Sequence, residues 1–294
     1  MGRGSGKGGL LGFLYGTAPG RLLLRPLTSR GVSRMAGRLM DSRVSKPLIA
    51  PFIRKNGIEM GEYLPEDYPS FNAFFTRRIR PEARPIDPDP AHLIAPCDGR
   101  LSVYAIGEDS VFTIKNSRYD VPSLLGGDPR AAAFTGGVCL VFRLSVDDYH
   151  RYHYLDDGEK GDNRFLPGVL HTVRPIALSH TAVFVQNCRE YTLMVTRHLG
   201  LVAQIEVGAL LVGRISNNQG AGSFCRGEEK GRFLYGGSTI VVLLTRDAAR
   251  IDDIYWQATA REEETRVRLG QRIGEAGKGV THAEMAERAG AQTV

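Results

Sequence analysis

The chain carries, near its C-terminal end, the stretch Tyr235-Gly-Gly-Ser-Thr-Ile-Val-Val-Leu-Leu244. The run that ends it is short and wholly apolar, which predicts a buried strand. Gly236 and Gly237 allow backbone distortion, so the hydroxyl of Ser238 can reach the carbonyl carbon before it. Glycine and serine are also common in ordinary turns. The stretch therefore predicts either a turn that enters a buried strand or a self-cleaving bond between Gly237 and Ser238.

Self-cleavage at this bond would turn a serine into a carbonyl cofactor. Attack by Ser238 Oγ on the Gly237 carbonyl would replace the amide with an ester. Elimination would leave dehydroalanine, and hydration with loss of ammonia would leave a pyruvoyl group. A serine hydroxyl is a poor nucleophile without a base and an orienting carboxylate. The hypothesis therefore requires both groups elsewhere in the chain.

Two other segments supply such groups. The first, Asp147-Asp-Tyr-His-Arg-Tyr-His153, carries two histidines three residues apart, His150 and His153. The second, Ala95-Pro-Cys-Asp-Gly-Arg100, places Asp98 in a tight turn before a strand-like run. An Asp-Gly pair on its own is most often a structural turn. The two segments point to chemistry only when they are taken together with the serine.

The three segments, in this order, resemble the phosphatidylserine decarboxylase family, whose members carry Pro-x-Asp-Gly, Asp-Tyr-His-Arg-x-His and Gly-Ser-Thr. The resemblance extends from about residue 10 to about residue 275 and includes Tyr68-Pro-Ser-Phe-Asn-Ala-Phe-Phe-Thr-Arg-Arg78 and Arg84-Pro-Ile-Asp87. Many members have Leu-Gly-Ser-Thr at the processing site. The second glycine at position 236 resembles a Gly-Gly-Ser-Thr subgroup of the family.

The resemblance implies a role for each of these residues. Asp98 would orient and support His153, which would deprotonate Ser238 for self-cleavage. His150 would protonate the carbanion that is left when carbon dioxide departs. A three-residue spacing puts side chains on opposite faces of a strand but on one face of a helical turn. The sequence therefore leaves open an exchange of roles between His150 and His153.

The implied activity is decarboxylation of phosphatidylserine to phosphatidylethanolamine and carbon dioxide, through a Schiff base to the pyruvoyl group made from Ser238. No external cofactor is required. Two alternatives remain: a pyruvoyl-dependent decarboxylase of a soluble amino acid, and a non-enzymatic membrane-lipid-binding module. No metal is expected, because the spacing of the two histidines differs from that of a zinc helix and no Cys-x-x-Cys accompanies them. No Gly-x-Ser-x-Gly hydrolase motif surrounds Ser238.

The first fifty residues hold the excess positive charge. They contain nine Lys and Arg against one Asp, or +8, while the whole chain is +6, so the remainder sums to −2. Arg30, Arg34 and Arg38 alternate with apolar residues at helical spacing, which predicts an amphipathic helix. Such a helix can bind an anionic phospholipid membrane or pack on the protein's own core. Nucleic-acid binding is disfavoured because aromatic residues do not interleave with the basic ones.

The sequence predicts peripheral attachment at the cytoplasmic face of the cell membrane. Charges, glycines and prolines interrupt every apolar stretch before it could cross a bilayer, and no signal-peptide cleavage site follows residues 10–15. The four cysteines match no disulfide framework, so reduced thiols are expected. The charged run 226–232 is typical of a solvated loop, here one that positions the cleaved bond.

The expected fold class is α+β, a mostly antiparallel β core with N-terminal amphipathic helices, self-cleaved into a large and a small chain. Residues 1–60 form the basic membrane-associating helical region. Residues 61–274 form the catalytic β-rich domain, cleaved at 237/238, and residues 275–294 form a mobile tail with a short helix at 283–289. A homodimer is left open. Strands are expected at 101–105, 111–114, 138–145, 182–186, 191–196, 201–207 and 240–244, and a short helix at 71–78.

Overall fold

A mixed antiparallel β fold with a separate group of N-terminal helices is seen in the computed structural model, which describes residues 10–114, 117–173, 175–178, 182–209, 214–235 and 238–277. The largest sheet has nine strands, in the order β12-β7-β9-β10-β14-β5-β2-β16, with β8 also paired to β9. Its strands are β2 Gly99–Ala105, β5 Val138–Leu144, β7 Gly158–Lys160, β8 Arg164–Leu166, β9 Arg189–Thr196, β10 Gly200–Val207, β12 Gly222–Phe224, β14 Ser238–Leu244 and β16 Thr265–Val267.

Strand β14 lies at the centre of this sheet, between β10 and β5. Its seven residues are all buried. Val241 and Leu243 pack into one hydrophobic core cluster, and Ile240, Val242 and Leu244 pack into a second one. The strand is apolar without alternation because both faces of the sheet are covered at this point. The buried strand expected from the run 240–244 is therefore confirmed.

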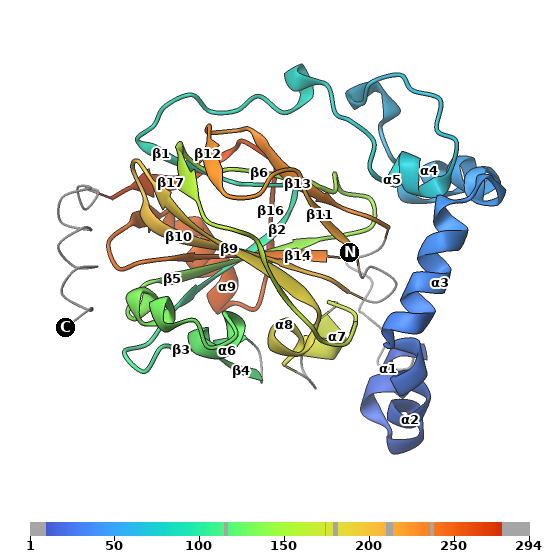
Figure 1. Cartoon of the computed structure of the whole chain (residues 1–294), viewed down its shortest axis with the longest axis horizontal. Helices are drawn as coiled ribbons and strands as arrows, with labels where there is room; N and C mark the ends of the chain where they lie inside the picture. The colour runs from blue at the N-terminus through green and yellow to red at the C-terminus, as the bar shows by residue number, and fades with distance from the viewer. Residues whose placement is uncertain are drawn as a thin grey trace.

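Three smaller sheets surround the large one. The sheet that carries the histidine motif has the order β11-β13-β6, with β6 Arg151–His153, β11 Ile215–Asn217 and β13 Glu229–Phe233. A second contains β1 His92–Ile94, β15 Ala249–Ile251 and β17 Arg272–Ala276, and a third pairs β3 Val111–Ile114 with β4 Ser117–Asp120. The helices within the body are α6 Val121–Leu124, α7 Pro175–Leu178, α8 Val183–Gln186 and α9 Asp253–Ala260, with 3-10 helices η3 Pro81–Ala83 and η4 Pro129–Phe134. Helix α5 Phe71–Phe75 instead packs beside the N-terminal helices (Figure 1).

Most of the expected strands are present. The runs 101–105, 111–114 and 138–145 correspond to β2, β3 and β5, and the expected hairpin across residues 197–200 joins β9 to β10 in antiparallel register. The short helix expected at 71–78 begins at Phe71 and already ends at Phe75. Ser70 caps its N-terminus by accepting a hydrogen bond from the Ala73 amide.

Two sequence expectations are wrong. The segment 182–186 is helix α8 rather than a strand, with Gln186 N bonded to the Ala182 carbonyl. Val183 and Phe184 pack into a core cluster from this helix, so tertiary packing overrides the β propensity of the segment. The charged run 226–232 is also not a solvated loop, because residues from Glu229 onward form β13 and Lys230 is fully buried.

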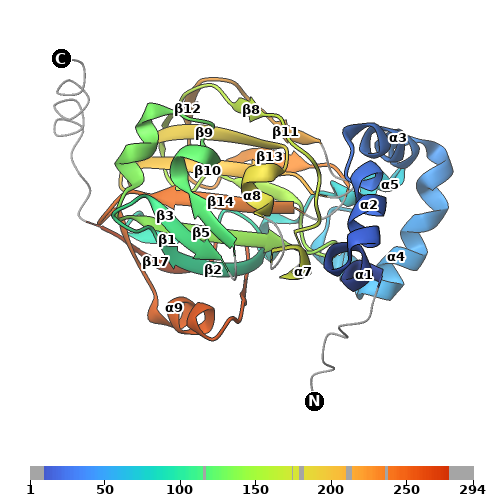
Figure 2. The same cartoon turned by 90° about the horizontal axis from the view of Figure 1, so that it is seen from below.

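The N-terminal helices lie together at one side of the β-rich body (Figure 1). They are α1 Leu10–Gly16, α2 Ala18–Leu27, α3 Arg30–Asp41 and α4 Ile49–Asn56, with 3-10 helices η1 Arg43–Leu48 and η2 Met60–Glu62. Figure 2 shows the same separation from below. Tyr15 ties α1 to the body, because its hydroxyl accepts a hydrogen bond from Thr172 N at 3.1 Å.

No helix among the described residues is both long enough and apolar enough to cross a membrane. Residues 278–294, with the helix expected at 283–289, lie outside the described residues.

Candidate active site

Ser238 is the first residue of β14, and its side chain is fully buried. Its Oγ makes no hydrogen bond with any described residue. A buried hydroxyl without a partner lowers stability, and such groups occur where reactivity rather than packing matters. Gly236 and Gly237 lie outside the described residues.

His150 lies directly before β6 and is fully buried. Its backbone carbonyl accepts a hydrogen bond from Phe233 N at 2.9 Å, which connects it to the strand that leads towards Ser238. Its Nδ1 lies 2.9 Å from the Asp148 carbonyl oxygen. A carbonyl can only accept, so Nδ1 carries the hydrogen, and Nε2 is the nitrogen that can exchange a proton. The Phe75 ring lies against the imidazole, with centroids 4.1 Å apart.

His153 ends β6, and the segment that joins it to His150 is extended rather than helical. Its Nδ1 is buried and makes no hydrogen bond with a described residue. Burial lowers the pKa of His153 to about 4, Glu229 and Asp98 oppose this shift, and Arg151 adds to it. The imidazole is therefore neutral near pH 7, which is the state that a general base requires.

Asp98 lies next to the histidine strand, because His153 N donates to the Pro96 carbonyl at 2.8 Å. The Asp98 carboxylate is held by other groups. Arg84 Nε donates to Oδ1 at 2.8 Å and Arg84 Nη2 to Oδ2 at 2.7 Å, while Leu269 N donates to Oδ1 at 2.9 Å. Asp98 makes no hydrogen bond with His153 Nδ1. The structure thus brings the two residues into one region, and their link is electrostatic.

Two arginines of this region were not predicted as site residues. Arg84 is buried and neutralises Asp98. Arg77 is 1% exposed and forms no ion pair with a described residue. Its Nη2 donates to the Tyr63 hydroxyl and to the Asp147 carbonyl, both at 3.1 Å, and its guanidinium lies 4.3 Å from the centroid of the Tyr63 ring. Both arginines lie in segments that carry the family resemblance, and this resemblance is the sequence signal that could have identified them as site residues.

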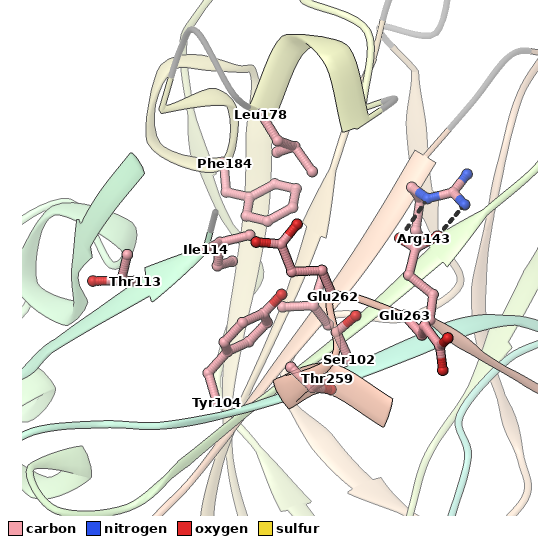
Figure 3. Close-up of a pocket in the computed structure, with 12 residues that line it drawn as sticks. Ser102, Tyr104, Thr113, Ile114, Arg143, Leu178, Phe184, Thr259, Glu262 and Glu263 are labelled. Carbon is pink, nitrogen blue, oxygen red and sulfur yellow. Dashed lines mark hydrogen bonds and ion pairs between the residues drawn. The ribbon is translucent and has the colours of Figure 1, made fainter. Parts of the chain in front are cut away.

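A pocket of about 260 Å³ lies on the other face of the large sheet (Figure 3). Val141 lines it and pairs with Val241, which is three residues from Ser238 and so faces the opposite side. Tyr104 and Phe184 line its walls, and Arg143 is paired with Glu264 at its edge. The pocket is therefore separate from the serine and the histidines. Among the described residues, no three His, Cys, Asp or Glu side chains gather as a metal site.

Comparisons with known proteins identify the family. The model of the family described as "Phosphatidylserine decarboxylase" matches residues 71–275. A protein from Clostridium acetobutylicum named phosphatidylserine decarboxylase proenzyme 2 is 42% identical over 270 residues, which is 92% of each chain. Phosphatidylserine decarboxylase proenzymes of Ruminiclostridium cellulolyticum and Chlamydia muridarum are each 37% identical, over 91% and 82% of both chains respectively. The chain therefore belongs to the phosphatidylserine decarboxylase family.

Proposed function

We propose that the chain is a precursor that cleaves itself between Gly237 and Ser238 and then decarboxylates phosphatidylserine to phosphatidylethanolamine and carbon dioxide. The family membership supports the activity, and the proenzyme names of the relatives support a precursor. The observation that carries the proposal is the buried Oγ of Ser238 at the start of β14, which makes no hydrogen bond with a described residue. Self-cleavage would remove this hydroxyl, because its oxygen leaves in the carboxylate of Gly237.

His153 serves as the base for maturation. Its neutral imidazole accepts the proton of Ser238 Oγ as that oxygen attacks the Gly237 carbonyl carbon. Elimination then separates Gly237, as a carboxylate, from a dehydroalanine at position 238. Addition of water and loss of ammonia complete the change, so the balance is one water consumed and one ammonia released. Asp98, fixed by Arg84, favours the imidazolium that forms during this step.

His150 serves turnover. The pyruvoyl carbonyl supplies an electron sink for the substrate amine when carbon dioxide leaves. With the hydrogen on Nδ1 held by the Asp148 carbonyl, His150 moves its catalytic proton through Nε2. The Phe75 ring and the complete burial of His150 keep water from competing for that proton.

The N-terminal helical region, residues 1–60, attaches the enzyme to the cytoplasmic face of an anionic membrane. Of the ten exposed large apolar side chains that the structure describes, seven lie between residues 13 and 48: Phe13, Leu22, Leu23, Met35, Leu39, Val44 and Leu48. Met35 is 69% exposed and Leu39 53%, so these two apolar side chains of α3 are not packed on the protein's own core, whereas Met40 at the end of the same helix packs against the phenylalanines of α5. Exposed apolar groups among arginines are typical of a helix that lies in a membrane interface.

Intact mass spectrometry of the purified protein tests the proposal. Two chains are expected, residues 1–237 and a pyruvoyl-capped chain that begins at position 238. Ser238→Ala should leave one polypeptide and abolish activity, because the attacking oxygen is gone. Assays with phosphatidylserine vesicles and with free amino acids decide between the lipid and a soluble substrate. Normal cleavage of Ser238→Ala would refute the assignment, and an intact wild-type chain without activity would support a lipid-binding module.

A further inference from the structure

We infer that Asn72 is a positioning residue for self-cleavage and that helix α3 holds it in place through Asp41. The inference rests on the proposed cleavage between Gly237 and Ser238. It makes the N-terminal helical region part of the maturation machinery, in addition to its proposed role at the membrane.

The backbone just before the cleaved bond is held by the side chain of Asn72. Asn72 Oδ1 accepts a hydrogen bond from the Tyr235 amide at 2.9 Å. Tyr235 is two residues before Gly237, and Asn72 is 5% exposed. An amide group has a single oxygen, so the orientation of this side chain is set by the requirement to accept from Tyr235. The contact spans 163 positions in the sequence.

The ring of Tyr235 is held by the same helix, α5. It meets Phe71 edge to face, with centroids 5.0 Å apart, and Phe75 in the same way at 5.3 Å. The same helix also reaches the active site, because Phe75 lies against His150 as well. A single short helix thus fixes both a candidate catalytic histidine and the segment that leads to the cleaved bond.

Asp41 completes the arrangement from the N-terminal region. It is the last residue of α3, and its Oδ1 accepts a hydrogen bond from Asn72 Nδ2 at 2.5 Å. Its second oxygen accepts from Arg214 at 2.6 Å. Asn72 therefore connects two segments: its nitrogen is bound to α3, and its oxygen is bound to the segment between β13 and β14 that contains the proposed cleavage site.

The geometry of this connector bears on the cleavage rate because the serine must approach a carbonyl two residues beyond Tyr235. A misplacement of about 1 Å can cost roughly a hundredfold in rate for a reaction between groups held in place. Without the carboxamide, the amide of Tyr235 also loses its partner in a part-buried setting. Loss of the hydrogen bond to Tyr235 should therefore slow self-cleavage, although Ser238 and His153, which carry out the chemistry, are still present.

Precursor made by cell-free synthesis allows the cleavage rate to be followed by gel and by intact mass. Asn72→Ala should slow cleavage by about ten- to a hundredfold. Asn72→Asp should also be slow, because two carboxylates then face each other. The exchange Asp41→Asn with Asn72→Asp restores both hydrogen bonds: the carboxylate at position 72 accepts from the Tyr235 amide as Asn72 does, and the bond between positions 41 and 72 has its donor and acceptor reversed. This exchange should return the rate to within about threefold of wild type. Asp67→Asn is the matched control, because it removes only the exposed Lys46–Asp67 ion pair between the same two regions.

A second measurement separates positioning from general stability. Molecules of Asn72→Ala that do mature should decarboxylate at the wild-type rate per pyruvoyl group, because Asn72 acts before the bond is cut. In the Ser238→Ala background the exchange variant should match the melting temperature of Ser238→Ala alone. Wild-type cleavage in Asn72→Ala, or equal slowness of Asn72→Asp and the folded exchange variant, would overturn the inference. Failure of the proposed function would instead appear as an uncut wild-type chain or a cut Ser238→Ala chain.

Discussion

His153 combines near-complete burial with a pKa lowered to about 4, and this combination makes its proposed role testable. The neutral form is the active base, so the cleavage rate should stay level from pH 8 to about 5 and halve near pH 4. An imidazole with an ordinary pKa would halve the rate near 6.5. The folded pKa lies below the unfolded one, so stability also falls as pH drops between these values. Rates should therefore be compared only where circular dichroism shows Ser238→Ala to be folded.

Alanine substitutions distinguish the proposed roles of the two histidines. His153→Ala should block maturation and leave a single chain. His150→Ala should mature but lose turnover by about a hundredfold or more, the usual contribution of a positioned acid. Intact mass reports maturation, and carbon dioxide release per pyruvoyl group reports turnover. The opposite pattern would exchange the assigned roles.

Strand β13 contains a buried charged residue, Lys230, in a run whose charged sequence is typical of a solvent-exposed loop. Lys230 Nζ lies 2.8 Å from Glu206 Oε1, and both side chains are fully buried between β13 and β10. Asn217 Oδ1 accepts a further hydrogen bond from Lys230 at 2.7 Å. Burial raises the pKa of Glu206, and Lys230 opposes that shift. Removal of either partner would therefore leave the other charged group buried without a counter-charge.

Lys230→Met should lower the free energy of unfolding by about 3–5 kcal/mol, because it leaves the Glu206 carboxylate buried without its cation. Urea unfolding in the Ser238→Ala background measures the change on a single chain. Arg118→Ala serves as the control, because its ion pair with Asp109 is exposed and should contribute less than about 1 kcal/mol. A loss in Lys230→Met no larger than that of the control would contradict this account.

At the scale of the whole molecule, charge and exposed apolar groups coincide. The first fifty residues carry +8 against −2 for the rest, and they contain most of the exposed large apolar side chains that the structure describes. Attraction of arginines to anionic headgroups and insertion of apolar side chains should act together. The helices stand to one side of the body, so their surface can meet a bilayer without the β core (Figure 2).

Replacing Met35 and Leu39 with serine should weaken binding to phosphatidylglycerol-containing vesicles by about tenfold or more. The reason is that burial of each apolar side chain in the membrane would contribute about 1.5–3 kcal/mol to the binding free energy. Co-sedimentation measures the affinity, and added salt should weaken binding by the wild type. Ile254→Ser is the control: its side chain is 59% exposed on α9, away from the N-terminal helices (Figure 2). Equal binding by all three proteins would argue against this surface.

Local pattern predicted several of the long strands, and the family resemblance supplied the roles of the candidate residues. The apolar run 240–244 predicted β14, and alternating or apolar runs predicted β2, β5 and the β9–β10 hairpin. The local sequence pattern gave the wrong secondary structure where tertiary packing decided it. Helix α8 forms from a segment with strand-like composition because Val183 and Phe184 fill the core from a helical turn. A charged run became β13 because Glu206 was available to pair with Lys230.

By itself, the amino-acid sequence determined which groups are available: a serine after two glycines, two histidines in one motif and an aspartate in a turn. Only the tertiary structure decided how they are held. Arg84 and the Leu269 amide bind Asp98, and Asn72 binds the backbone of Tyr235, across separations of up to 171 residues. Periodicity reports the environment of a residue within its own element, whereas these contacts arise when strands and helices distant in the chain are packed together.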